Sequence, residues 1–246
     1  MIFRSTTTFL KGNWIIILLP ILIFFGLHYI LDFNGLYGQD SHEYLRFSKE
    51  LKDAFSQSNH EFTEFYWPKG YPVLGALLSY TGLSVLSALR FISLLSLILT
   101  LIYTRKIIFL LFNTESNWFL ILGAITQVYF IRSGLLVMSD STAMCFVVLT
   151  FYFYLKFLKD KKTLFFVAVL FFFIASVFCR YASVPLVFLP LFHGAFLFLK
   201  KFNLWLAIGI ILFLGIGISF FVYSNNHLFE YGIHVDEYWN FRNIFS

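Results

Sequence analysis

Residues 83–104 read LSVLSALRFISLLSLILTLIYT, and this stretch decides the class of fold. Its 22 residues contain a single charged side chain, Arg90. A helix that crosses the hydrocarbon core of a bilayer needs about 20 consecutive, mostly apolar residues. The stretch therefore predicts a transmembrane helix.

The remainder of the chain has the same character. Of its 246 residues, 59% are hydrophobic and only 13% are charged, whereas about 25% of the residues of a soluble domain are charged. We therefore predict an all-α, polytopic membrane protein with about seven transmembrane helices. The predicted spans are 14–31, 83–104, 118–137, 141–158, 163–179, 182–199 and 203–223.

The charged residues predict the orientation of these spans. The N-terminal tail and the loops 105–117, 156–162 and 200–203 hold ten Lys and Arg residues against two acids. Because cytoplasmic loops are enriched in Lys and Arg, we place the N-terminus in the cytoplasm and residues 224–246 outside. The net charge of +5 thus reflects topology and does not indicate nucleic-acid binding. The Phe-, Ile-, Lys- and Asn-rich composition fits an AT-rich bacterial genome, and we expect the protein in a bacterial cytoplasmic (inner) membrane.

One hydrophilic segment is long, the first outer loop at residues 32–82, within what we predict to be a single transmembrane domain of residues 1–246. We expect two interfacial helices in this loop, lying on the outer surface of the bilayer. The first is amphipathic. Its apolar face is predicted to comprise Tyr44, Leu45, Phe47, Leu51, Ala54 and Phe55.

The end of the loop is rich in aromatic residues and prolines. Aromatic rings are enriched at membrane interfaces, where we expect to find Phe65, Tyr66, Trp67 and Tyr71. A rigid turn before the second, short helix is predicted from Pro68, Gly70 and Pro72.

Asp40, in the stretch GLYGQDSHEYL at residues 35–45, admits two interpretations. Asp40 and Glu43 have the spacing of a helix capping box, in which both side chains bind backbone N–H groups. Alternatively, Asp40 is the base of an active site. The two roles are compatible, because a capping position also fixes the carboxylate.

Other ionisable residues are predicted on the same side of the membrane, and ionisable groups within a membrane are usually functional. Each also has a simpler interpretation. Asp140 is in position to cap a helix. Arg132 and Arg180 are placed where long side chains reach the headgroups by snorkelling. Lys69 lies in a surface loop, where a lysine is ordinarily solvated. Arg90 is assigned no function. A metal site built from Asp40, His42 and Asp140 is a further alternative.

Four features, in this order, resemble the GT-C superfamily of membrane glycosyltransferases, which includes protein O-mannosyltransferases and the bacterial aminoarabinose transferase. An acid, Asp40, follows the first span, and the turn WPKGYP at residues 67–72 leads into the second span. The pair Ser139–Asp140 follows the third span, and the pair Arg180–Tyr181 ends the fifth. The resemblance extends over about residues 10–225.

This resemblance implies transfer of a sugar from a polyprenyl-phosphate donor to a hydroxyl acceptor at the non-cytoplasmic face, with inversion. Asp40 would be the general base, and Asp140 would hold sugar hydroxyls, orient a cation or bind a divalent metal. Lys69 and Arg180, with Arg132 third, would stabilise the departing phosphate. Further substrate contacts are expected from His42, Glu43, Trp67, Tyr71 and Tyr181. We also expect one outward-facing cavity to be lined by Asp40, Lys69, Asp140 and Arg180.

Superfamily members are usually about twice as long, so the resemblance implies that this chain carries the N-terminal module, with a partner subunit as an open possibility. Two other functions stay open. One is a non-catalytic relative that binds or scaffolds lipid-linked sugars. The other is a transporter or flippase, which is expected to have ionisable residues near the middle of the membrane, whereas here they gather at one face.

Overall fold

The computed structural model describes residues 2–56, 65–113, 123 and 128–185, and all regular secondary structure in this part is helical. The helices are α1 (Ile2–Ile30), α2 (Gly38–Ser56), α3 (Gly70–Ser79), α4 (Val85–Phe112), α6 (Val128–Leu135), α7 (Asp140–Asp160), α8 (Thr163–Cys179) and the short 3-10 helix η1 (Tyr181–Ser183). The predicted all-α class is thus confirmed for the described residues. The predictions for the span 203–223, most of 182–199 and the segment 224–246 lie outside them, and the single-domain prediction remains untested.

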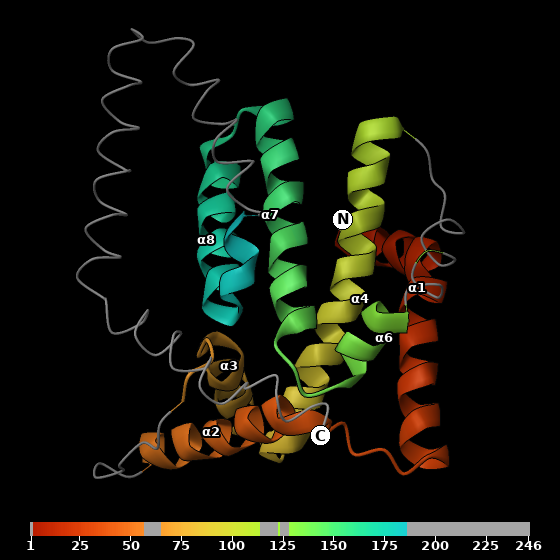
Figure 1. The fold of residues 1–246 in the computed structure, drawn as a ribbon. Helices are drawn as coiled ribbons and strands as arrows, with labels where there is room; N and C mark the ends of the chain where they lie inside the picture. Colours follow the sequence, from red (N-terminus) through yellow and green to blue (C-terminus); the bar gives the residue numbers. More distant parts are fainter. Residues whose placement is uncertain (1, 57–64, 114–122, 124–127, 186–246) are drawn as a thin grey trace, which may run out of the picture. The chain divides into compact units, whose positions relative to one another are not determined.

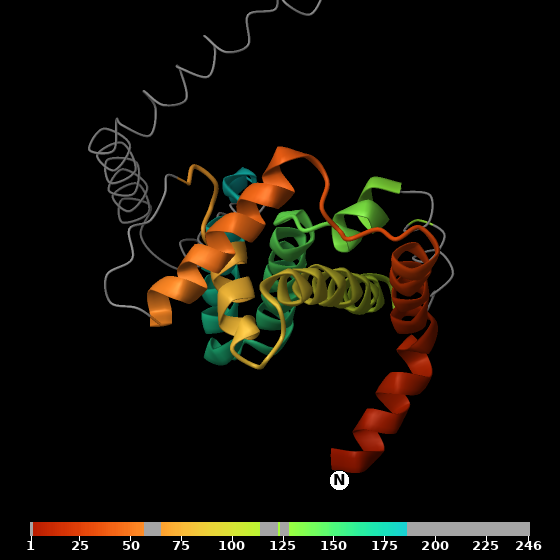
Figure 2. The same cartoon turned by 90° about the horizontal axis from the view of Figure 1, so that it is seen from below.

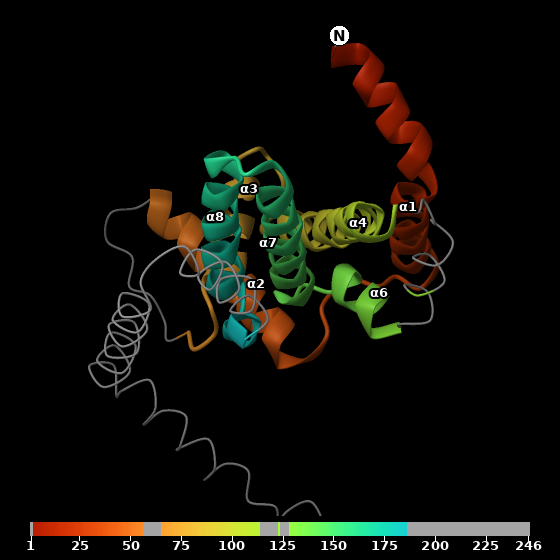
Figure 3. The same cartoon turned by 90° about the horizontal axis from the view of Figure 1, so that it is seen from above.

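Four long helices form a row in the order α8, α7, α4 and α1, as seen from above in Figure 3. Among the described residues, α4 and α7 are long and apolar enough to cross a membrane. The apolar part of α1, Trp14–Ile30, and α8 are shorter. The described part of the predicted third span is the eight-residue helix α6. The seven-span topology therefore remains a prediction.

Local sequence signals set the ends of α4 and α7. The Ser84 side chain accepts a hydrogen bond from the backbone N–H of Ser87 at 3.1 Å and so caps the start of α4. Asn113 and Lys161 follow α4 and α7 in the left-handed conformation, with φ of 54° and 56°. A residue in this conformation stops a helix and lets its N–H bind a carbonyl of the last turn.

Helix α2 lies crosswise at the end of the molecule where α7 begins and α8 ends (Figure 1). Seen from below, it passes over α3 (Figure 2). Its buried face includes Tyr44, Phe47 and Leu51, at 3, 3 and 8% exposure, as the amphipathic pattern predicts. Phe55, also assigned to this face, is 56% exposed. Its assignment to the apolar face of an interfacial helix stays a prediction.

Several of the aromatic residues before and within α3 form core contacts, and their predicted place at a membrane interface stays a prediction. Tyr71 is completely buried, and its hydroxyl lies 3.0 Å from the Leu89 carbonyl and 2.7 Å from Ser93 Oγ. The Phe65 ring stacks on Phe47 with 4.1 Å between centroids. Tyr66, by contrast, is 62% exposed.

The turn WPKGYP is the point at which α3 meets the end of α8. A Cβ atom on Gly70 would lie 2.7 Å from the carbonyl carbon and oxygen of Phe178 and 3.0 Å from the backbone nitrogen of Cys179. Only glycine permits so close an approach between two backbones. The start of α3 is therefore fixed against the residues that immediately precede Arg180.

Candidate active site at the start of α2 and α7

The Asp40 carboxylate lies in the first turn of α2, and it forms no hydrogen bond or ion pair within the described part of the chain. The helix begins two residues earlier, at Gly38, whose φ is +69°. Glu43 accepts hydrogen bonds from Arg46 Nε at 3.0 Å and Nη2 at 2.6 Å, along the helix surface. The capping-box interpretation of Asp40 and Glu43 is therefore wrong, and the half-buried Asp40 side chain does not cap the helix.

Asp140 and Arg180 form an ion pair between Asp140 Oδ1 and Arg180 Nη1. Asp140 is the first residue of α7, and the residue before it, Ser139, is in the N-cap position. The interpretation of Asp140 as the N-cap is therefore wrong. Its second oxygen, Oδ2, is buried and accepts no hydrogen bond from the described residues. Arg180 follows the last residue of α8 in an extended conformation, so the ion pair joins the start of one long helix to the end of the next.

Tyr44 connects α2 to the start of α7, and sequence reasoning assigned it only to an apolar face. Its hydroxyl lies 2.9 Å from Ser139 Oγ in a buried hydrogen bond. Its ring packs edge-on against Tyr71, with 5.3 Å between centroids. The sequence could have indicated this role of Tyr44, because Tyr44 follows Asp40 by one helical turn and both therefore lie on the same side of α2.

The pKa of the Tyr44 hydroxyl responds to several charged groups near it. Burial raises the pKa above its ordinary value, which the Ser139 hydrogen bond and the charge of Arg180 partly oppose. The charges of Asp40 and Asp140 raise it further. Two acids and one cation, predicted as site residues from distant parts of the sequence, therefore lie within electrostatic reach of one buried hydroxyl.

Backbone contacts hold the segment before α2 against the segment before α7. The Gly35 carbonyl accepts a hydrogen bond from the Val137 N–H at 2.9 Å. Nearby, the Arg132 guanidinium lies 4.1 Å from the centre of the Tyr37 ring, a cation–π contact. Arg132 thus reaches the loop that leads to Asp40, and the structure places it against an aromatic face.

The other predicted site residues differ in their surroundings. Lys69 is exposed, with its ammonium 5.8 Å from the centre of the Phe47 ring, and it precedes the Gly70 contact with α8. His42 and Tyr181 are exposed, and Trp67 is half-buried against the core. The buried Tyr71 lies beneath the site, where its proton stays bound because burial raises its pKa. Its predicted substrate contact is replaced by a packing role.

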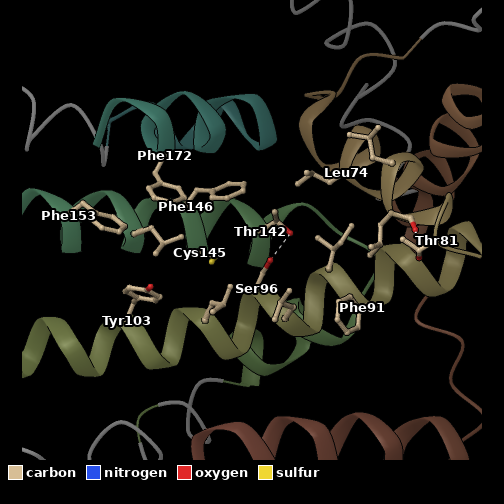
Figure 4. A pocket seen from close by; sticks show the side chains of 16 residues that line it. Leu74, Thr81, Phe91, Ser96, Tyr103, Thr142, Cys145, Phe146, Phe153 and Phe172 are labelled. Atoms are coloured by element: carbon tan, nitrogen blue, oxygen red, sulfur yellow. Dashed lines mark hydrogen bonds between the residues drawn. The ribbon is translucent and has the colours of Figure 1, made fainter. Parts of the chain in front are cut away.

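The described residues contain no cluster of three His, Cys, Asp or Glu side chains arranged to hold a metal ion, so the geometry does not support a site built from Asp40, His42 and Asp140. A large apolar groove, with a volume of about 710 Å³, lies between α4 and α7 and extends to α3 and α8 (Figure 4). Its lining includes none of Asp40, Lys69, Asp140 and Arg180. This groove is therefore not the predicted shared cavity, which stays a prediction.

Comparison of the chain with protein-family models, with curated proteins and with solved structures gives no match.

Proposed function

We propose that the chain is a multi-pass membrane glycosyltransferase that moves a sugar from a polyprenyl-phosphate donor to a hydroxyl acceptor at the non-cytoplasmic face. The observation that carries the proposal is that Asp40, Asp140 and Arg180 all lie where α2 meets the start of α7: Asp140 and Arg180 form an ion pair, Ser139 beside Asp140 is hydrogen-bonded to Tyr44, and Asp40 lies one helical turn before Tyr44. The sequence resemblance assigns chemistry to the first three of these residues. The apolar lengths of α4 and α7 support the membrane location.

In the proposed reaction, Asp40 accepts the proton of the acceptor hydroxyl, and the acceptor oxygen attacks the anomeric carbon of the donor. The bond from that carbon to the phosphate oxygen breaks as the new bond forms on the opposite face, so the configuration is inverted. Polyprenyl phosphate leaves with the bonding electron pair. Because phosphate is a good leaving group, one carboxylate base and nearby cations suffice.

Arg180 and Lys69 are the proposed cations. The Asp140 carboxylate holds Arg180 at the end of α8, and Gly70 fixes the chain beside Lys69 against the same helix end. Neutralising either cation should weaken binding of the donor more than binding of the acceptor. Unchanged donor affinity in both variants would favour snorkelling or solvation instead.

The test of the base compares Asp40→Asn with Asp53→Asn, which alters an exposed acid on the same helix. Membranes containing each variant receive polyprenyl phosphate carrying labelled mannose, glucose or aminoarabinose, and the labelled product is identified. We expect Asp40→Asn to abolish transfer while the protein still inserts and binds donor, and Asp53→Asn to keep wild-type transfer. Wild-type turnover in Asp40→Asn would contradict the assignment.

One observation favours a second function, a non-catalytic protein that binds lipid-linked sugars. Arg180 is already paired with Asp140 in this structure, so it is less able to stabilise the charge that develops on a departing phosphate, which catalysis requires and binding alone does not. This alternative predicts donor binding by the wild type without a labelled product from any donor–acceptor combination, including membranes that supply a partner subunit.

A further inference from the structure

The groove between α4 and α7 ends beside two lysines. Its lining runs from Leu74 and Thr81 at the α3 end to Tyr103 and Phe153 at the other (Figure 4). The Lys106 ammonium lies 4.4 Å from the centre of the Tyr103 ring and 5.6 Å from that of Tyr152. Tyr103 therefore contacts both the groove and a cation.

Lys156 lies one helical turn after Tyr152 on α7, and the Tyr152 ring is also contacted by Lys106. Lys156 is also paired with Asp160 at 3.6 Å, and both side chains are about 30% exposed. The Tyr103 and Tyr152 rings meet edge-on, with 4.9 Å between centroids. Two cations thus adjoin an aromatic pair at the Tyr103 end of an apolar groove.

The part of the groove that α4 lines has a length close to the thickness of one leaflet of a bilayer. From Phe91 to Tyr103, α4 rises about 18 Å at 1.5 Å per residue, and half of the hydrocarbon core is about 15 Å thick. The volume of about 710 Å³ lies within the range of ligand pockets. Among the lining residues, the polar contact at mid-groove is internal, from Ser96 to Thr142 at 3.3 Å (Figure 4).

We propose that this groove binds a glycerophospholipid with an anionic headgroup, with one acyl chain between α4 and α7 and the headgroup phosphate at Lys106 and Lys156. The charge distribution predicts that this end of α4 is cytoplasmic, so the lipid belongs to the inner leaflet. The lysines favour this occupant over a lipid entering from the α3 end, where the lining side chains Leu74, Leu77 and Thr81 are uncharged. The inference rests on the proposed membrane location and is independent of glycosyl transfer.

The test measures retention of phosphatidylglycerol and phosphatidylcholine by the purified full chain in nanodiscs, using native mass spectrometry. Each Lys near an anionic lipid surface contributes about 1 kcal/mol, so the Lys106→Gln/Lys156→Gln variant should bind phosphatidylglycerol roughly 30-fold more weakly. Its binding of phosphatidylcholine should not change. The matched control, Lys161→Gln/Lys162→Gln, removes two lysines between α7 and α8 and should bind both lipids as the wild type does.

Two further variants separate binding from folding. Lys106→Arg/Lys156→Arg should restore binding of phosphatidylglycerol. Leu95→Trp, at an exposed residue of the groove lining, should reduce binding of both lipids. Equal losses in the two Lys→Gln variants, or competition by glycerol phosphate as strong as by the intact lipid, would overturn the proposal. The proposal would also be overturned if polyprenyl phosphate displaced phosphatidylglycerol and this displacement required Lys69 and Arg180. Sugar transfer by the Lys106→Gln/Lys156→Gln variant is measured separately, so loss of lipid binding with transfer intact leaves the proposed function standing.

Discussion

Replacing Gly70 with alanine tests whether the contact between α3 and α8 positions Arg180. The new Cβ would lie 2.7 Å from backbone atoms of Phe178, about 0.7 Å inside the 3.4 Å at which ordinary van der Waals contact begins. A backbone cannot rotate away as a side chain can, so α3 and α8 must separate. Overpacking of this kind typically costs about 1–3 kcal/mol. We expect a loss of that size in the free energy of unfolding.

The matched control is Gly26→Ala, within α1, where a Cβ has no neighbour within 4 Å. Alanine in a helix interior is more favourable than glycine by roughly 0.5–1 kcal/mol, so this variant should be as stable as the wild type or slightly more so. Both are compared by denaturant unfolding in detergent micelles and by affinity for polyprenyl phosphate. If Gly70→Ala were as stable as Gly26→Ala and bound the donor equally well, the proposed role of the contact would be refuted.

Three further predictions concern the same end of the molecule. Tyr44→Phe and Ser139→Ala should each lower the free energy of unfolding by about 1 kcal/mol, and the double variant should lose little more than either alone; strict additivity would show that their 2.9 Å contact contributes nothing. Asp140→Asn should change the free energy of unfolding by less than about 1 kcal/mol, because the ion pair with Arg180 is partly exposed, but it should alter the affinity for the donor. A large loss of stability with unchanged donor affinity would indicate that the ion pair is purely structural. Burial raises the pKa of Tyr71 above its ordinary value of 10.0. As pH rises past about 10, Tyr71 therefore loses its proton in the unfolded chain before it does so in the folded protein, and the free energy of unfolding falls. Tyr71→Phe should flatten this fall between about pH 9 and 11, and an unchanged slope would contradict the burial of Tyr71 as its cause.

The elements that sequence reasoning predicted are those governed by local rules. The apolar stretch at residues 83–104 and the helical period of Tyr44, Phe47 and Leu51 require no knowledge of distant residues. The prolines and glycine of WPKGYP likewise indicate a turn and a helix start from local chemistry alone. For this reason α2 and α3 are helical as expected, and α4 begins within two residues of the predicted span; it ends at Phe112, however, so much of the predicted loop 105–117 is helical.

The errors come from contacts made at a distance. A period identifies which face of a helix is apolar, but it does not identify which element covers that face or where the cover ends. The sequence therefore does not reveal that Tyr71 is completely buried, and it does not distinguish the buried Phe47 from the exposed Phe55 on the same apolar face. Tyr44 was overlooked as a site residue because its partner, Ser139, is 95 positions away.

The hydrogen bond between Gly35 and Val137 holds together the two segments from which the chain continues to Asp40 and Asp140. Asp40 follows Gly35 by five residues, and Asp140 follows Val137 by three. Because successive residues are about 100° apart around a helix, inserting or deleting one residue in either short segment would turn a carboxylate away from the other. The lengths of these two segments thus set the relative orientation of the two carboxylates. We expect both segments to tolerate substitutions far better than insertions or deletions.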